Sequence, residues 1–260
     1  MNIQVPQLCI ITGYYGVGKT NLSLNLARTA AASLAADATS TSIDKATESA
    51  HNQKVVTLID LDIINPYFRS SDYAEKLQDE RIKMIIPAFA RTGLETPALS
   101  AAINGALESK GTVIVDVGGD DAGATTLARY NSDIKRRLSR TDTAEYALWY
   151  VVNRNRSTTE SLDAAIAETL WQLREIEKAC KLKITGIINN THLQEETGLE
   201  TILEGICFAD RLARDAGLPL VATTIPRTLL EQAATNPKLA ELQASGQLQP
   251  VEHLVTTPWQ

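Results

Sequence analysis

The sequence predicts a three-layer α/β fold in which a mostly parallel central sheet is flanked by helices. Short apolar runs of strand length alternate with longer segments whose apolar residues repeat at helical spacing. The first apolar run opens into a glycine-rich turn, and acidic or amide side chains follow several later runs. Strands that alternate with helices form right-handed βαβ units, and parallel sheets bind ligands at the carboxyl ends of their strands.

Length and charge limit the class of protein. At 260 residues the chain can build a sizeable core, and we expect a single domain over residues 1–260. The formal net charge of −6 does not favour broad binding to nucleic acid or to anionic membrane. No window holds the roughly 18 consecutive apolar residues of a membrane helix, and the start of the chain lacks a secretory pattern, so we expect a soluble protein.

The three cysteines are far apart in the chain and show no metal-ligand spacing with each other or with histidine. Cys9 falls inside a predicted core strand, where a free thiol behaves as a small hydrophobe. Together with Cys180 and Cys207, it is most consistent with a reducing cytoplasm.

The first predicted strand, at residues 8–11, leads into the pattern G-x-x-x-x-G-K-[ST] of a phosphate-binding loop. Glycines let successive backbone N–H groups turn towards a phosphate, and the predicted helix at 21–32 points its positive end at the same anion. Lys19 can reach the terminal phosphates, and the Thr20 hydroxyl suits Mg²⁺. The nucleotide-binding residues predicted in this segment are Gly13, Gly16, Val17, Gly18, Lys19, Thr20 and Asn21.

Residues 33–54 are rich in Ala, Ser, Thr, Asp and Lys, with hardly a large apolar side chain. Such a segment buries too little surface to offset its ordering entropy, so we expect a flexible insertion. A buried strand at 55–59 follows and ends in Asp60 and Asp62, which places two carboxylates at the ligand edge of the sheet. A short helix is predicted at 72–77.

A second acidic strand end follows further along the chain. After a strand at 82–86 and a helix at 96–108, the apolar run 112–115 is followed directly by Asp116. A strand that ends in aspartate is the expected second half of a phosphate-loop site, because its carboxylate can hold Mg²⁺ directly or through water. Gly118 would let the backbone approach the terminal phosphate.

A basic segment at residues 124–140 is predicted as one helix. A basic helix face could meet DNA or an acidic partner, but most such clusters are solvated surface, so we do not expect nucleic-acid binding. The basic residues are Arg129, Lys135, Arg136, Arg137 and Arg140.

The alternation continues with strands at residues 146–152, 184–188 and 220–224 and helices at 158–179 and 200–216. Asparagines follow two of these strands, and an asparagine amide can read a purine by donating and accepting at once. We expect the nearby His192 to be a surface residue. The final segment, 236–260, contains no basic amphipathic helix, so a membrane anchor is not expected there.

Four motifs, in this order and spacing, resemble those of the MinD/ParA-type P-loop ATPases of the CobQ/CobB/MinD/ParA group. They are GYYGVGKT, the DLD of residues 60–62, the DVGG of 116–119 and the strand GIINN. The likeness covers roughly residues 8–227 and is greatest to the uncharacterised bacterial ATP-binding members. It implies a P-loop NTPase fold, ATP and Mg²⁺ as ligands, and a nucleotide-dependent homodimer.

The resemblance also implies roles for individual residues. Lys19 and Asp62 are the implied catalytic residues, with Asp62 orienting the attacking water. The implied Mg²⁺ residues are Thr20, Asp60 and Asp116. Asn189 matches an adenine-reading asparagine, and Ile225, Pro226 and Arg227 fall where family members close over the base.

One position departs from the family pattern. Many members carry a signature lysine early in the loop that reaches the partner's nucleotide, and this chain has Tyr14 there. Another cation, such as Arg69, Arg154 or Arg156, would have to replace that lysine, or else hydrolysis is slow and depends on a partner.

These expectations lead to three hypotheses of function. The first is a Mg²⁺-dependent ATPase whose nucleotide cycle drives a conformational or dimerisation switch. The second is a nucleotide-gated binding protein with little intrinsic hydrolysis, which would engage an unknown protein partner. The third is an ATP-dependent small-molecule ligase or kinase, in which Arg154 and Arg156 would clamp an anionic substrate.

Overall fold

The computed structural model describes residues 1, 3–40, 55–62, 81–86, 97–119, 121–140 and 146–255. Within them, eight strands form one parallel sheet in the order β3-β2-β4-β1-β5-β6-β7-β8. The strands are β1 (Leu8–Gly13), β2 (Val56–Leu61), β3 (Ile82–Ile85), β4 (Thr112–Val117), β5 (Tyr146–Val152), β6 (Gly186–Asn189), β7 (Leu220–Pro226) and β8 (Leu248–Val251).

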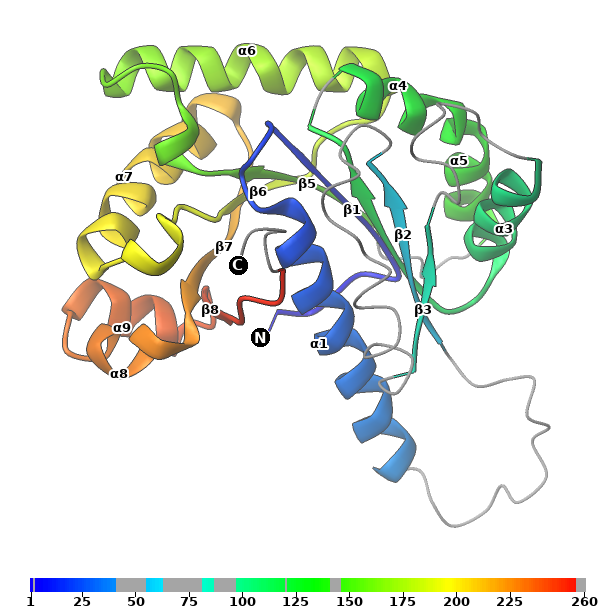
Figure 1. The fold of residues 1–260 in the computed structure, drawn as a ribbon, viewed down its shortest axis with the longest axis horizontal. Coiled ribbons are helices and arrows are strands. Elements are labelled where there is room, and N and C mark those ends of the chain that lie inside the picture. Colours follow the sequence, from blue (N-terminus) through cyan, green and yellow to red (C-terminus); the bar gives the residue numbers. More distant parts are fainter. Residues whose placement is uncertain are drawn as a thin grey trace.

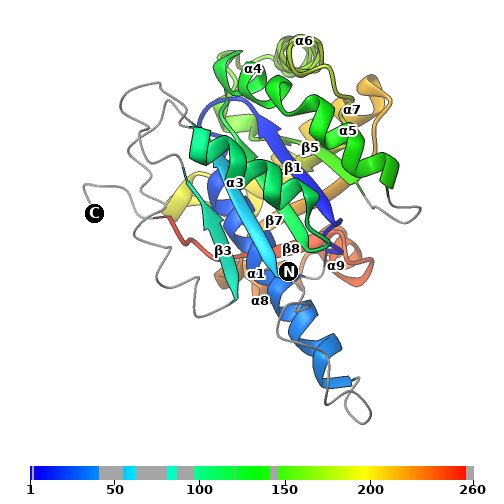
Figure 2. The same cartoon turned by 90° about the vertical axis from the view of Figure 1, so that its right-hand side faces the viewer.

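Helices cover both faces of the sheet (Figure 1). The helices are α1 (Lys19–Ser40), α3 (Pro97–Glu108), α4 (Asp121–Arg129), α5 (Asn131–Arg140), α6 (Leu162–Cys180), α7 (Leu199–Ala216), α8 (Leu230–Ala233) and α9 (Pro237–Ala244). Helix α6 lies across one end of the molecule in Figure 1 and is seen end-on in Figure 2. The predicted fold class, a three-layer α/β fold with a parallel central sheet, is confirmed.

The two faces of β1 show how the sequence builds the layers. Leu8 and Ile10 pack with residues of α3 to α7, whereas Cys9 and Ile11 pack with the apolar side of α1. Because successive side chains of a strand point to opposite faces, a run of four apolar residues is buried on both sides. A third cluster joins α7, α8 and α9 to the ends of β7 and β8.

Several elements differ from the sequence-based predictions. Helix α1 continues to Ser40, so residues 33–40 are helical where an insertion was expected; its second half projects beyond the sheet in both views (Figures 1 and 2). Residues 41–54 and 72–77 lie outside the described residues. The C-terminal segment adds helix α9 and strand β8, which the sequence patterns did not indicate.

The predicted basic helix is two helices, α4 and α5, separated at Tyr130. Tyr130 is buried, and the side chain of Asn131 donates hydrogen bonds to the carbonyls of Cys180 and Lys181 at the end of α6, each at 3.0 Å. Asn131 therefore satisfies carbonyls that the end of α6 leaves without helical partners. These long-range contacts place the break between the two helices.

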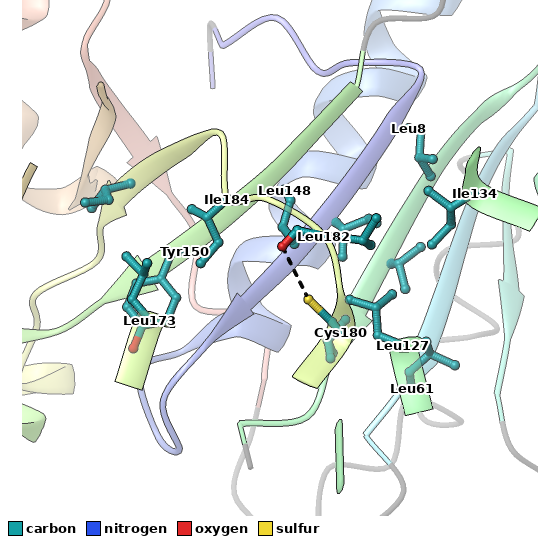
Figure 3. Close-up of a cluster of buried hydrophobic side chains, with 14 of the residues drawn as sticks. Leu8, Leu61, Leu127, Ile134, Leu148, Tyr150, Leu173, Cys180, Leu182 and Ile184 are labelled. Atoms are coloured by element: carbon teal, nitrogen blue, oxygen red, sulfur yellow. Dashed lines mark hydrogen bonds between the residues drawn. The ribbon is translucent and has the colours of Figure 1, made fainter. Parts of the chain in front are cut away.

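The prediction that Cys9 lies inside a core strand is confirmed, because Cys9 is buried in β1. All three are free thiols; Cys9 and Cys180 are buried and Cys207 is exposed. Figure 3 shows Cys180 among apolar side chains of the main core, with its thiol 3.8 Å from the Leu182 carbonyl oxygen. Burial raises the pKa of both buried thiols.

In the described part of the chain, no helix is both long enough and apolar enough to cross a membrane.

Candidate functional site

The glycine-rich loop connects the carboxyl end of β1 to the amino end of α1, which is the setting that a phosphate-binding loop requires. At Gly18 the backbone has φ +85°, and a Cβ there would lie 2.5 Å from the Asn190 Nδ2. Only glycine fits this position, because the conformation and the close neighbour both exclude a side chain. The loop is thus packed against the end of β6.

Lys19 lies under the loop and is only 7% exposed. Its Nζ donates a hydrogen bond of 2.9 Å to the carbonyl of Tyr14, at the other end of the loop. This contact ties the ammonium group to the first part of the loop. The negative oxygens of a phosphate would compete for it there.

The two acidic strand ends meet beside the loop. Asp60 of β2 and Asp116 of β4 are direct neighbours in the parallel register, and the Asp62 N–H donates to an oxygen of Asp60 at 2.9 Å. Asp116 also accepts a hydrogen bond from the Thr20 hydroxyl. The structure therefore brings together all three predicted metal residues, Thr20, Asp60 and Asp116.

Asp116 is strongly perturbed by this environment. Burial, and to a lesser extent the negative charge of Asp60, raises the pKa of Asp116 to about 7, while Lys19 and the Thr20 hydrogen bond oppose the rise. Its side chain is 3% exposed, and its Oδ1 has no hydrogen-bond partner among the described residues. A buried carboxylate oxygen without a partner is costly unless a cation or a donor completes it.

These side chains fit Mg²⁺. Among the described residues, no three His, Cys, Asp or Glu side chains form a metal cage by themselves. Mg²⁺ does not need such a cage, because it is usually bound by one or two carboxylates together with water and substrate phosphates. Asp116, Asp60 and the Thr20 hydroxyl supply that partial set of oxygen ligands.

The turn after β4 closes against the loop. Gly118 and Gly119 are both buried, and a Cβ on Gly119 would lie 2.7 Å from the Lys19 Nζ and 2.7 Å from the Tyr15 nitrogen. The turn and the loop are thus in van der Waals contact. The predicted approach of the Gly118 backbone to a terminal phosphate stays a prediction.

The strand ends of β5 and β6 also reach the loop, through Arg156, a candidate cation from the sequence, and Asn190, one of the asparagines that follow a strand; their contacts with the loop were not predicted. The Asn190 Nδ2 donates to the Val17 carbonyl at 2.7 Å, and the Arg156 Nε donates to the Gly16 carbonyl at 3.1 Å. Both partners are backbone oxygens far away in the chain. The spacing of residues in the sequence therefore does not indicate these contacts.

Asn189, the predicted base-reading residue, is fully buried. Its amide donates to the Thr223 hydroxyl at 3.4 Å and accepts from the Thr191 hydroxyl at 2.7 Å. A contact between this side chain and a base would require these bonds to be exchanged, and its role stays a prediction.

Asn21 of the predicted loop set, and the predicted base-side residues Pro226 and Arg227, are described by their contacts within the protein. The side chain of Asn21 donates to the Glu252 carbonyl at 3.0 Å and accepts from the Leu254 N–H at 2.8 Å. Pro226 ends β7, and the exposed guanidinium of Arg227 lies 3.4 Å from the Glu252 carboxylate. These residues do share the carboxyl edge of the sheet with the loop.

His192 differs from the expected surface histidine. It is half-buried, with its Nε2 3.1 Å from the position of a Cβ on Gly18, and its Nδ1 accepts from the Gln194 N–H at 3.2 Å. Burial, and secondarily the charges of Arg156 and His253, lowers the pKa of His192 to about 4. His192 is therefore a neutral imidazole beside the loop at neutral pH.

The arginines proposed from the sequence separate into different environments. The Arg154 guanidinium donates to the carbonyls of Thr159 and Glu160 and lies 5.9 Å from the Phe208 ring centre, so it is fixed within the protein. The two guanidiniums are thus held by different protein groups, and the anion clamp of the ligase hypothesis stays a prediction. Arg69 lies outside the described residues.

The fold and the site together define a three-layer α/β protein with a glycine-rich loop between β1 and α1 and a cluster of carboxylates beside it. No protein-family model and no curated protein sequence matches this chain.

Solved structures with a similar arrangement have low identity to the chain. Cell division protein FtsY from Thermotoga maritima is 18% identical, with a TM-score of 0.47 over 86% of this chain and 64% of that protein. FlhF complexed with GTP/Mg²⁺ is 15% identical, with a TM-score of 0.45 over 86% of this chain and 67% of that protein. Signal recognition particle receptor FtsY from Elizabethkingia anophelis is 15% identical, with a TM-score of 0.46 over 87% and 60%.

Proposed function

We propose that this protein is a Mg²⁺-dependent ATP-binding protein and ATPase of the MinD/ParA-like class, in which nucleotide state drives a conformational or dimerisation switch. The observation that carries the proposal is the convergence of Lys19, Thr20, Asp60 and Asp116 beside a glycine loop that ends at a helix N-terminus. Cations, backbone N–H groups and Mg²⁺ ligands at one point are the parts that phosphoryl transfer requires. The proposal treats residues 1–260 as one nucleotide-binding domain.

Each group has a defined task in this proposal. Backbone N–H groups of the loop bind the phosphates, and Lys19 exchanges the Tyr14 carbonyl for a terminal phosphate oxygen. Mg²⁺, when bound, would neutralise charge on the terminal phosphates. Asp62, which lies beside Asp60, orients the attacking water. Positioning and charge neutralisation are sufficient for this reaction, because a phosphoryl group in transfer needs little covalent help.

The choice of ATP and of the cytoplasm rests on the sequence. The chain lacks an N-K-x-D run, and its motifs resemble those of ATP-binding relatives, so ATP is proposed over GTP. Three free cysteines favour a reducing compartment. A protein partner or a second copy of the chain is the proposed recipient of the conformational change.

The test measures phosphate release by the purified protein from Mg²⁺-ATP and from Mg²⁺-GTP. Lys19→Ala and Asp62→Ala are compared with Arg136→Ala, whose side chain is about half exposed. We expect turnover with ATP that both site variants abolish and that the Arg136 variant retains. Full turnover in Asp62→Ala would refute the role of that carboxylate.

One observation favours a second candidate, a nucleotide-gated binding protein with little hydrolysis. Tyr14, at the position of the signature lysine, is 40% exposed and cannot supply a cation. Tight nucleotide binding without phosphate release, together with a partner captured only in the presence of ATP and not ADP, would support this candidate over the ATPase.

A further inference from the structure

Two successive carbonyl groups of the phosphate loop are held by side chains from distant strand ends. Gly16 accepts from the Arg156 Nε at 3.1 Å, and Val17 accepts from the Asn190 Nδ2 at 2.7 Å. The peptide bonds of the described residues are trans and planar, so each N–H points away from the carbonyl of the preceding residue. The Arg156 donor therefore orients the peptide between Gly16 and Val17, so that the Val17 N–H points away from Arg156. In the same way, the Asn190 donor orients the next peptide, so that the Gly18 N–H points away from Asn190.

The Asn190 amide is itself fixed in one orientation. Its oxygen accepts from the Thr224 hydroxyl at 2.5 Å, and Asn190 and Thr224 are 6% and 3% exposed. Because the oxygen is committed to Thr224, the NH₂ group must face the Val17 carbonyl. The backbone N–H of Asn190 also donates to the Val152 carbonyl at 2.8 Å, which ties it to β5.

Arg156 lies in a turn that is held by side-chain hydrogen bonds. The turn η2 (Arg154–Arg156) is capped by the Asn153 side chain, which accepts from the Asn155 N–H at 3.0 Å and donates to the His192 carbonyl at 3.2 Å. Within the described part of the chain, the Gly16 carbonyl is the hydrogen-bond partner of the Arg156 guanidinium. Arg156 is otherwise exposed.

We propose that Arg156 and Asn190 are positioning residues of the phosphate loop, which aim the Val17 and Gly18 N–H groups at the terminal phosphates of a nucleoside triphosphate. Arg156 also places a positive charge in cis beside the loop, near the position where Tyr14 replaces the signature lysine. Of the three arginines that the sequence offered for that task, Arg154 bonds to the carbonyls of Thr159 and Glu160, and Arg156 bonds to the loop. The inference rests on the proposed nucleotide site and assigns it two further residues.

The test uses two probes, Mg²⁺-ATP and inorganic tripolyphosphate with Mg²⁺, in calorimetric titrations of the full chain. Asn190→Asp keeps the shape of the side chain but replaces the donor by an acceptor, and Arg156→Met removes donor and charge. Asn155→Ala is the matched control, because Asn155 is exposed in the same turn. We expect both variants to bind both probes about tenfold more weakly or worse, and the control to bind as the wild type does. Arg156→Lys, which keeps a charged donor, should recover part of the loss.

Tripolyphosphate separates the loop role from a base contact, since it has no base. If Asn190→Asp weakens ATP binding but not tripolyphosphate binding, Asn190 reads the base and the positioning role is refuted. Unchanged affinity of both variants for both probes would also refute it. A loss of affinity matched by a lower unfolding midpoint in Asn190→Asp, with Arg156→Met binding normally, would reduce Asn190 to a structural residue. If the wild type binds neither probe, the proposed function falls as well.

Discussion

Gly119, in the turn after β4, lies in close contact with the backbone of the glycine-rich loop. A Cβ at this position would lie 2.7 Å from the Tyr15 nitrogen and 2.8 Å from the Tyr14 carbonyl carbon, both backbone atoms. Backbone of a packed loop cannot yield as the end of a flexible side chain can, so the loop itself must shift.

We therefore expect Gly119→Ala to weaken nucleotide binding about tenfold or more while the protein stays folded. Gly105→Ala is the matched control, because Gly105 lies in helix α3 with nothing within 4 Å of the added Cβ. That variant should be more stable by roughly 0.5–1 kcal/mol, from helix propensity alone. Nucleotide titration and urea unfolding measure the two effects; equal binding by both variants would contradict the contact.

His192 makes the stability of this region depend on pH. Its folded pKa of about 4 lies below the usual 6.5, so between these values the unfolded chain binds a proton that the folded protein does not. Stability is therefore complete above about pH 6.5 and falls as the pH drops towards 4. The neighbouring charges of Arg156 and His253 act in the same direction as burial.

His192→Asn removes the titrating ring and keeps an acceptor near the Gln194 N–H. We expect the wild type to lose up to roughly 3 kcal/mol of unfolding free energy through this group between pH 6.5 and 4, and the variant to lose correspondingly less. Urea unfolding across this pH range measures the difference. Parallel curves for the two proteins would show that His192 titrates normally.

At the residue scale, the sequence predicted those site residues that belong to a motif of short, fixed spacing. Lys19 and Thr20 follow a glycine pattern, and Asp60 and Asp116 each end an apolar strand, so the loop and strand ends could be recognised without coordinates. Asn190 and Arg156 bond to backbone carbonyls, which every residue carries. Their contacts depend on which way neighbouring side chains point at a strand end, and Asn189, one position earlier, points into the protein instead.

At the scale of elements, Arg137 joins pieces that are far apart in the sequence. Its guanidinium, 7% exposed, donates to five carbonyl groups at the end of α3 and at the entries to β1 and β4. These are the carbonyls of Ala106, Leu107, Ser109, Gln7 and Gly111. The sequence placed this arginine in a basic surface cluster, but it is a buried support that satisfies the carbonyls left open where α3 ends.

Replacement of Arg137 by Ala leaves buried carbonyl groups without donors, so we expect a loss of roughly 3 kcal/mol of unfolding free energy. Arg136→Ala is the comparison from the adjacent position. Arg136 pairs with Glu108 and Asp133, but its side chain is 51% exposed, so its loss should cost less than about 1 kcal/mol. Denaturant unfolding measures both. Equal losses in the two variants would contradict the supporting role of Arg137.

The elements themselves were predicted where periodicity is strong and missed where tertiary contacts decide. The strand at residues 146–152 and the start and end of α7 agree with the sequence pattern within one residue. The boundary between α4 and α5 depends on Asn131 and the end of α6, which no local pattern contains. Strand β8 includes Pro250, a residue that argues against a strand unless it lies at a sheet edge, and β8 is one of the two edge strands of the described sheet.

At the scale of the whole molecule, residues far apart in the sequence meet on the helix that follows the glycine-rich loop. Residues 252–255, here called the strap, run along the first turns of α1. Asn21 and Asn25, one turn apart on α1, each donate to the Glu252 carbonyl, and they accept from the Leu254 and Glu252 N–H groups respectively. Val255 at the end of the strap is 6% exposed and packs into the core beneath α1.

The strap also forms ion pairs with two arginines. The Glu252 carboxylate lies 2.7 Å from the Arg28 guanidinium and 3.4 Å from that of Arg227. The side chains of the ion pairs are partly exposed. Asn25, in contrast, is 7% exposed, and its side chain bonds to both the N–H and the carbonyl of Glu252. The hydrogen bonds of the asparagines, rather than the ion pairs, should therefore carry most of the stabilisation.

Asn25→Ala should accordingly lower the unfolding free energy by about 1–3 kcal/mol, because the Glu252 N–H and carbonyl lose a buried partner. Glu252→Gln, which removes only the ion pairs, should cost less than about 1 kcal/mol. A chain that ends at Val251 loses the bonds and the Val255 contact together and should be the least stable of the three. Urea unfolding ranks them, and hydrogen exchange of the first turns of α1 shows where the loss acts. Because Asn21 follows the loop directly, faster exchange there would mean that the C-terminal segment steadies the helix end on which the proposed phosphate site is built. A truncated chain as stable as the full one would remove that link.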